Sequence, residues 1–234
     1  MTMKRTTLIA GVLALAATAA GCGIAGPAAQ ATSSYEVPGD VTGLRVEVDS
    51  GTVELVGADR RGVRVTERLT WRKHKPETSH EVRGGTLDLV HGCPATFGLG
   101  AIGGECEVSY RVEVPKGVRA EVGSDSGDLT LSGLSGEVRV SSDSGTIRAE
   151  GLAGGRVTAT SDSGDVTLAF TAQPDQVTTE NDSGRTVVRV PAGPYRVEAE
   201  TDSGDKRITA AADASARRSI KVSSDSGDLE VLTP

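Results

Sequence analysis

Residues 120–131 read AEVGSDSGDLTL, and residues 138–149 read VRVSSDSGTIRA. In both stretches apolar and polar side chains alternate on each side of a central Asp-Ser-Gly. Alternation with a period of two is typical of a β-strand that has one buried face. Asp-Ser-Gly favours a tight turn, because the Asp side chain accepts a hydrogen bond from the backbone two residues on and Gly tolerates positive φ. Each stretch therefore predicts two short strands joined by a tight turn.

This tripeptide recurs six times in the second half of the chain, with an earlier copy at Asp49. Successive glycines of the six copies lie 18, 19, 20, 20 and 23 residues apart, a period typical of a solenoid and too short for a propeller blade or a helical pair. The residues expected to form the repeated turn are Asp125, Ser126, Gly127, Asp143, Ser144, Gly145, Asp162, Ser163, Gly164, Asp182, Ser183, Gly184, Asp202, Ser203, Gly204, Asp225, Ser226 and Gly227.

The apolar positions change parity at each turn. Val138 and Val140 lie at odd distances before Gly145, whereas Ile147 and Ala149 lie at even distances after it. Within one straight strand, such a one-residue slip would move the apolar side chains to solvent. The two strands must therefore meet at a corner and face one interior. Small polar residues three places before each Gly are suited to hydrogen bonds between stacked repeats.

The repeats predict an all-β fold, a β-solenoid similar to a single-stranded β-helix, with about six regular coils of 18–23 residues. Residues 118–234 hold these coils, which we expect to pile in register in chain order. Residues 35–117 contain longer alternating runs and are expected to form the first coils and an N-terminal cap within the same domain, 35–234. The fifth repeat has Lys206 where an apolar residue is expected, which predicts a frayed or shifted second strand.

The N-terminus reads as an export signal, residues 1–21, with Lys4 and Arg5 followed by an apolar run too short to span ~30 Å of hydrocarbon. The small residues before Cys22 resemble a lipobox, which implies a lipidated Cys22 and a protein anchored at the extracytoplasmic face of the cell membrane. The alternative is a plain secretory signal that leaves Cys22 as an ordinary thiol. Residues 22–34, rich in Gly, Ala, Ser and Thr, predict a flexible tether.

Two other cysteines, Cys93 and Cys106, flank a glycine-rich segment. In an oxidising exterior we expect them to form a disulfide bond that acts as a staple. A metal site is a poor alternative, because His74, His80 and His91 show no ligand spacing with either thiol. No cofactor is expected.

Composition narrows the possible partners. Without Lys4 and Arg5 the mature chain has 23 basic and 32 acidic residues, a net charge of −9, which argues against binding to nucleic acid. Aromatic residues make up only 3% of the chain, which argues against an aromatic-lined sugar cleft. The expected partners are the membrane, through the anchor, and an envelope polymer or protein.

Enzymatic alternatives meet specific objections. Asp-Ser-Gly surrounds the nucleophile of chymotrypsin-like proteases, but seven copies cannot all be nucleophiles and the regular repeats contain no histidine. A β-helix enzyme acting on polysaccharides needs two carboxylates at a set separation and aromatic platforms, and the repeats offer only Phe170 and Tyr195. We therefore expect no catalytic residues.

In-register coils would align the repeated aspartates ~4.8 Å apart, where neighbouring carboxylates repel by roughly 1 kcal/mol in water. Two explanations are open: hydrogen bonds to turn amides together with solvent, or a bridging divalent cation such as Ca²⁺. The first is favoured, and no metal ligand is assigned.

The lipobox followed by strand units with Ser-Gly-Asp-Leu or Ser-Gly-Thr-Ile turns resembles a bacterial family of adhesin-type domains of unknown function with a β-solenoid-like fold. The likeness covers roughly Leu44 to Leu232 and implies binding rather than catalysis. The expected function is that of a non-catalytic surface lipoprotein, an adhesin-like or envelope-binding scaffold. An envelope polysaccharide-active enzyme and an accessory protein of envelope-stress signalling are the alternatives.

Overall fold

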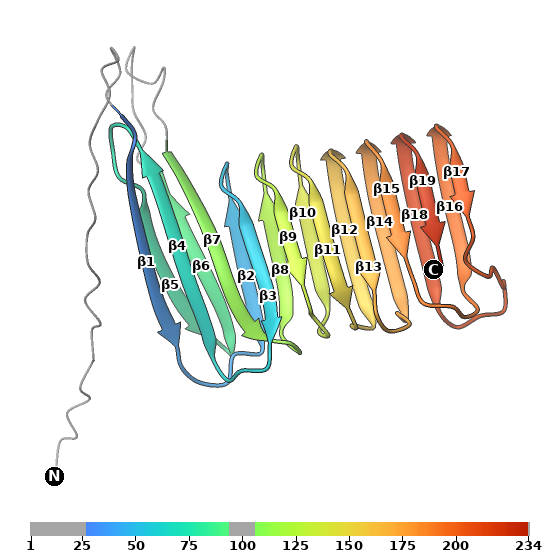
Figure 1. The fold of residues 1–234 in the computed structure, drawn as a ribbon, viewed down its shortest axis with the longest axis horizontal. Coiled ribbons are helices and arrows are strands. Elements are labelled where there is room, and N and C mark those ends of the chain that lie inside the picture. Colours follow the sequence, from blue (N-terminus) through green and yellow to red (C-terminus); the bar gives the residue numbers. More distant parts are fainter. Residues whose placement is uncertain (1–26, 94–105, 234) are drawn as a thin grey trace, which may run out of the picture.

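The structure, a computed structural model, describes residues 27–93 and 106–233. These residues form 19 strands in two sheets and contain no helix (Figure 1). In spatial order, sheet A consists of β1 (Ala29–Val37), β4 (Val63–Trp71), β7 (Cys106–Pro115), β3 (Val53–Ala58), β9 (Leu129–Ser132), β11 (Ile147–Leu152), β13 (Val166–Phe170), β15 (Thr186–Arg189), β19 (Leu229–Leu232) and β17 (Lys206–Ile208). Sheet B consists of β16 (Arg196–Ser203), β18 (Ser219–Ser226), β14 (Gln176–Ser183), β12 (Arg156–Ser163), β10 (Val138–Ser142), β8 (Arg119–Ser124), β2 (Gly43–Val48), β6 (Thr86–Gly92) and β5 (Glu77–Arg83).

Each repeat contributes one strand to sheet B, the Asp-Ser-Gly turn and one strand to sheet A, a unit that we call a rung. Neighbouring rungs pair in parallel and in register, so that Val138 lies between Ala120 and Val157 in sheet B. In sheet A, Ile147 correspondingly lies between Leu129 and Val166. All the turns therefore lie along one edge, at the top of Figure 1, which we call the turn edge.

The core lies between the two sheets and is built from the apolar columns of the repeat. Val138, Ile147, Val166 and Leu168 are each at most 1% exposed. Burying an aliphatic side chain of this kind contributes about 1.5–3 kcal/mol, so the stacked columns supply the main stabilisation of every rung. The parity change at the turn thus brings both strands of a rung onto one shared interior.

The rungs do not stack in chain order at either end, and the expectation that they would is wrong. Rung β18–β19 lies between β14–β15 and β16–β17. At the other end, β2–β3 lies between β6–β7 and β8–β9. The inserted C-terminal rung buries Ile220 and Leu229, whereas the outermost rung carries the exposed Lys206. The more apolar rung therefore occupies the position with neighbours on both sides.

The second strand of the fifth repeat is short rather than absent. β17 spans only Lys206–Ile208, and all three residues are exposed. Lys206 pairs in register with Leu229, at a level where the other rungs place apolar residues or Thr186 in the core. A lysine is tolerated there because no further rung covers it.

The predicted tether is too long, because residues 29–34 belong to strand β1. This strand pairs with β4 over nine residues in an antiparallel arrangement. An edge strand whose faces are mostly exposed needs no alternating apolar pattern, so its Ala-, Thr- and Ser-rich sequence carries no strand signal. The C-terminal end of β1 is fixed by packing, since Val37 is buried and Tyr35 packs against the core.

A buried carboxylate lies inside the N-terminal cap, which sequence reasoning did not identify. Glu67 of β4 is 5% exposed and accepts hydrogen bonds from Tyr35 Oη at 2.8 Å, Thr78 Oγ1 at 2.9 Å and Ser33 Oγ at 3.3 Å. These donors offset the cost of burying the carboxylate. Burial, followed by the negative charge of Glu67, raises the pKa of both Tyr35 and Tyr110 well above the usual tyrosine value. The cap is therefore held by a polar cluster as well as by apolar packing.

The turn glycines are required mainly by close approach, and the expected positive φ is found at only two of the six. Gly184 and Gly204 have positive φ, but Gly127, Gly145, Gly164 and Gly227 do not. A Cβ at Gly145 would lie 2.1 Å from the carbonyl oxygen of Gly127, and one at Gly164 would lie 2.4 Å from that of Gly145. Each glycine thus makes room for the backbone of the turn beside it.

We predict that Gly164→Ala destabilises the protein by about 1–3 kcal/mol, because the methyl group must displace the neighbouring turn. For a chain of this size that corresponds to a melting temperature roughly 2–10 °C lower, measured by circular dichroism. Gly117→Ala is the matched control, because a Cβ there meets no atom within 4 Å. Equal melting temperatures for the two variants would contradict the close-approach explanation.

Candidate functional site

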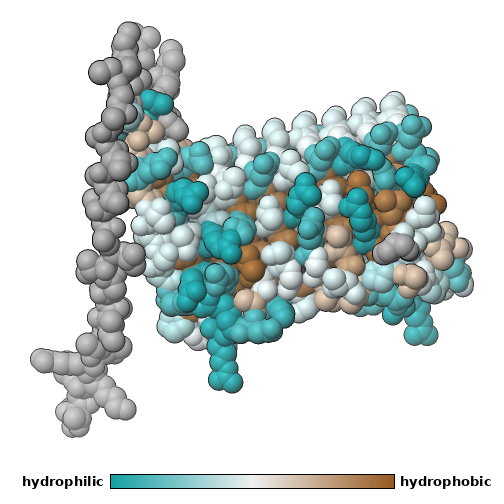
Figure 2. Space-filling view, viewed as in Figure 1, coloured by the Kyte–Doolittle hydropathy of each residue, from teal (hydrophilic) through white to brown (hydrophobic). Residues whose placement is uncertain are grey.

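The stack aligns one exposed aspartate from each turn, in the spatial order Asp49, Asp125, Asp143, Asp162, Asp182, Asp225 and Asp202. We call this set the aspartate row. Register within the row is fixed by the strands that precede the turns, since Ser161 pairs with Asn181 and Ser163 with Ser183. Figure 2 shows the turn edge, along its top, as a regular ridge repeated from rung to rung.

The predicted turn residues take two arrangements. In the rungs of β8 and β10 the strand ends before the tripeptide, so Asp125–Gly127 and Asp143–Gly145 form the whole turn. In the rungs of β12, β14, β16 and β18, the Asp and Ser still belong to the strand and the chain leaves the strand at Gly164, Gly184, Gly204 and Gly227.

The turn serines, Ser126, Ser144, Ser163, Ser183, Ser203 and Ser226, are all exposed. Within the part of the chain that the structure describes, none of them shares a hydrogen bond with a histidine. A serine nucleophile needs a base within hydrogen-bond reach, so these residues do not form a catalytic pair.

The small polar residues beneath the turns hold them in two ways. Ser124 Oγ and Ser142 Oγ accept the backbone N–H of Gly127 and Gly145 at 2.7 Å, within their own turns. Asn181 Nδ2 instead donates to the carbonyl oxygen of Gly164 on the neighbouring rung, at 3.0 Å. The predicted hydrogen bonds between stacked repeats are therefore formed by only some of the small polar residues that lie three places before the turn glycines.

A second set of aspartates, which directly follow the turn glycines, is hydrogen-bonded to the backbone. The carboxylates of Asp128, Asp165 and Asp228 accept the backbone N–H of Thr146, Arg185 and Asp205 at 2.9, 2.9 and 3.0 Å. Each bond crosses to the adjacent rung, so these aspartates tie the stack together. These three carboxylates therefore contribute to the fold, although their residues remain exposed.

The outer faces of the sheets relieve like-charge stacking by alternating sign. On sheet B, Arg45 lies 2.9 Å from Glu121, and Glu137 pairs with Arg119 at 3.3 Å and with Arg139 at 2.7 Å. On sheet A, Arg185 pairs with Glu230.

The aspartate row has no such alternation. Among the described residues, an ion-pair partner is found only for Asp49, whose Oδ1 lies 3.4 Å from His91 Nε2. The row is thus a line of exposed negative charge without the alternation in sign seen among the ion pairs of the sheet faces.

This line is not arranged as a metal centre. Considering residues 27–93 and 106–233 only, no group of three or more His, Cys, Asp or Glu side chains could hold a metal ion. Stacking places the carboxylates side by side instead of around one point, whereas Ca²⁺ takes six to eight oxygen ligands.

A shallow hollow of about 430 Å³ lies on the outer face of sheet B over β5, β6 and β2. It is lined by residues of both signs, among them Arg45, Glu47, Arg83 and Asp88, and by the exposed Val90. A smaller hollow of about 170 Å³, bounded by Glu47, Asp49, Asp125 and Asp143, continues toward the turn edge. The sheet B face is therefore a furrowed polar surface that leads to the aspartate row.

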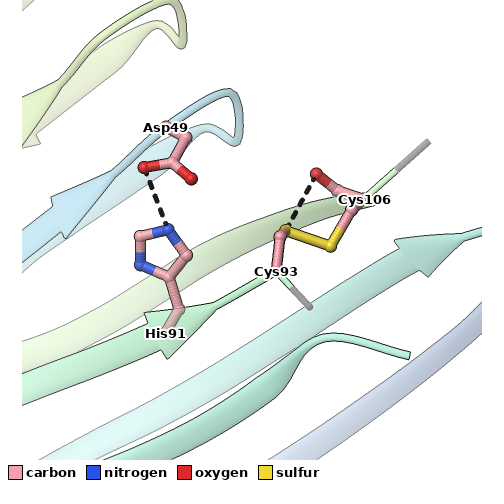
Figure 3. The surroundings of a disulfide bond; sticks show 4 residues. All are labelled: Asp49, His91, Cys93 and Cys106. Carbon is pink, nitrogen blue, oxygen red and sulfur yellow. Dashed lines mark hydrogen bonds and ion pairs between the residues drawn. A yellow bond between two sulfur atoms is a disulfide. The ribbon is translucent and has the colours of Figure 1, made fainter. Parts of the chain in front are cut away.

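Cys93 and Cys106 form a disulfide bond that closes the connection from β6 to β7 (Figure 3). This connection replaces the Asp-Ser-Gly turn in its rung, and the neighbouring turn contributes Asp49 beside His91. In the chain-entropy model, closing a loop of 13 residues contributes on the order of 3 kcal/mol. The bond therefore fastens the rung that lacks the usual short turn.

The predicted signal, residues 1–21, and the predicted lipidation site, Cys22, lie outside the described residues. Within those residues, no helix is long and apolar enough to cross a membrane.

Comparisons with known proteins give a family and several distant structural likenesses. No curated protein matches the chain. A solved structure described as a "putative cell adhesion protein" from Clostridium sporogenes is similar with 14% identity and a TM-score of 0.49, covering 88% of this chain and 100% of that one. A "putative adhesin" from Bacteroides fragilis is similar with 12% identity and a TM-score of 0.47, covering 88% and 97%.

The family model described as Toastrack DUF4097 matches residues 99–232, which is more than half of the 234-residue chain. The matched segment contains all six regular Asp-Ser-Gly turns and the strands that flank them. The chain belongs to the Toastrack (DUF4097) family.

Proposed function

We propose that this protein is a non-catalytic β-solenoid of six regular coils with an N-terminal cap, anchored by a lipid on Cys22 at the extracytoplasmic face of the cell membrane. It binds a cationic partner, an envelope polymer or protein, through the aspartate row. In this proposal residues 1–21 are the cleaved signal, 22–28 the tether, and 29–234 a single domain. The observation that carries the binding role is the row itself, seven exposed carboxylates in register that lack the neighbouring cations found in the ion pairs of the sheet faces.

Rigidity supports binding to a repetitive partner. Close backbone approach at the turn glycines and in-register pairing fix the spacing of the carboxylates before any ligand arrives. A preorganised array loses little conformational entropy on binding, and many weak contacts along one chain add up through multivalency. A polymer or protein that carries cations at intervals therefore fits the row better than a single small ligand.

The uniformity of the row argues against catalysis. General acid–base chemistry requires two carboxyl groups held in different environments, so that one is protonated while the other is ionised. All seven aspartates of the row are exposed and lie at the same point of the repeat, and among the described residues only Asp49 lies beside a histidine. The turn serines have no histidine partner among the described residues, and the residues that line the hollow on sheet B include no Phe, Tyr or Trp.

We predict that Cys22→Ser moves the protein from the membrane fraction to the soluble extracytoplasmic fraction, because the acyl chains have no attachment site. Fractionation followed by immunoblotting measures the distribution, and incorporation of a clickable fatty acid reports lipidation directly. Cys93→Ser is the control, because it removes a different cysteine, one that forms the disulfide bond with Cys106, and leaves Cys22 in place. Equal membrane association of Cys22→Ser and the unaltered chain would refute the anchor.

We also predict that Asp143→Asn combined with Asp162→Asn weakens binding to isolated cell envelopes at least about fivefold, since each exposed charge contact contributes ~0.5–1 kcal/mol. Co-sedimentation at increasing protein concentration gives the apparent Kd. The matched control is Asp40→Asn with Asp59→Asn, two exposed residues outside the turn edge that change the net charge equally. If both double variants bind alike, net charge and not the row determines binding.

A further inference from the structure

A cationic hairpin tip lies at the N-terminal end of the turn edge. The connection from β4 to β5 contains Arg72, Lys73, His74 and Lys75, all exposed, followed by Glu77 at the start of β5. Counting His74 as neutral, residues 72–77 carry a net charge of +2 in a chain whose total is −7. The sign of this local charge is therefore opposite to that of the chain as a whole and to that of the aspartate row.

The tip lies beside the point where the chain enters the fold. Ala29, the first residue of β1, pairs with Trp71, the last residue of β4. Figure 1 shows the start of β1 and the β4–β5 connection at the same corner, at the upper left. Trp71 also pairs with Cys106, so the tip and the disulfide-closed connection lie at the same edge as the turns.

The length of the tether limits how far this corner can be from the membrane. Only residues 23–28 separate the proposed anchor at Cys22 from Ala29. Seven residue steps of at most ~3.6 Å span no more than about 25 Å. The tip is thus held close to lipid headgroups, whereas the C-terminal rungs lie at the opposite end of the stack.

The side chains at the tip match the chemistry of an anionic membrane surface. Trp71 is partly buried against the core, and Lys75 Nζ lies 5.7 Å from the centroid of its ring. Tryptophan favours the membrane interface, where one part of its ring is in an apolar environment and the N–H is hydrated. Lysine and arginine close to anionic lipids are attracted over roughly one Debye length.

We propose that the tip formed by Trp71–Lys75 is a second membrane contact, which docks on anionic lipid headgroups beside the lipid anchor. This inference rests on the proposed anchor at Cys22. An acyl anchor and a basic patch together give a more durable attachment than either one alone. The same surface repels the aspartate row, so the stack tilts with its cap toward the membrane and its C-terminal rungs away from it.

Trp71 is the only tryptophan in the chain and reports on the contact directly. The purified full-length lipoprotein is bound to phosphatidylcholine vesicles with or without one third phosphatidylglycerol, in which part of the lipid is brominated near the headgroup end of its acyl chains. We expect at least about twofold stronger quenching of Trp71 on the anionic vesicles, and loss of this difference at high salt, where charges are screened.

The variant Arg72→Gln/Lys73→Gln/Lys75→Gln is expected to lose the difference between the two kinds of vesicle. The control Lys206→Gln/Arg207→Gln/Lys221→Gln removes the same charge at the distal end and is expected to keep it. The quenching of each variant is compared between the two kinds of vesicle, so that a change in the intrinsic emission of Trp71 caused by the substitutions cancels. Unchanged melting temperatures show that both variants fold.

Vesicle flotation separates the two ways in which the idea can fail. Protein that floats but shows equal quenching on both vesicles overturns the tip contact and leaves the anchor in place. Retention of the difference by the tip variant overturns the contact as well. Protein that does not float with either vesicle overturns the anchor and, with it, this inference.

Discussion

Contact between glycine backbones at successive turns is the constraint on which this fold depends. The carbonyl oxygen of Gly127 occupies the space that a side chain at Gly145 would need, and the same relation holds between Gly145 and Gly164. Turns that approach so closely fix the register of the strands on both sides of them. Once register is fixed, the period of two directs valine, leucine and isoleucine inward at every level and places the aspartates outward along one line.

In-register stacking also creates the electrostatic problem that the rest of the surface solves. A charge at a given position of the repeat lies next to its copies on both neighbours, so like charges accumulate unless the sequence varies. Pairs such as Arg45 with Glu121 relieve this on the outer faces, and backbone amides relieve it at Asp128 and Asp165. The turn edge is different: its aspartates stay aligned and exposed, and the cationic residues Arg72, Lys73 and Lys75 lie at its N-terminal end.

Local features of the fold could be predicted from the sequence because alternation and turn chemistry act over a few residues. The strands beside Asp-Ser-Gly and the shared interior follow from the parity change at Gly145, and the disulfide between Cys93 and Cys106 follows from their number and spacing. The reason for the glycines could not be predicted, because the clash is with another turn about 20 residues away. Strand β1 was missed because a solvated edge strand needs no apolar pattern.

Two further features depend on tertiary context. Glu67 occupies an inward position that any pattern of alternation would assign to an apolar residue, and only the hydroxyl groups of Ser33, Tyr35 and Thr78 make it acceptable there. The exchanged order of the last two rungs could not be predicted, because both repeats have the same pattern of apolar residues before the turn. Lys206 is the one residue in the sequence that indicates which of the two rungs lies outside. The Asp-Ser-Gly copies marked the candidate site, but its unbalanced charge emerged only from the pairing on the surrounding faces.

The exchanged order of the last rungs has a consequence for biosynthesis. Synthesis from the N-terminus produces β16–β17 before β18–β19, yet β14–β15 must pair with the later rung. Until residues 219–232 emerge, the stack ends in bare strand edges, which are prone to pair with other chains. Residues 219–232 therefore decide whether a newly synthesised chain reaches its finished state or remains liable to aggregate.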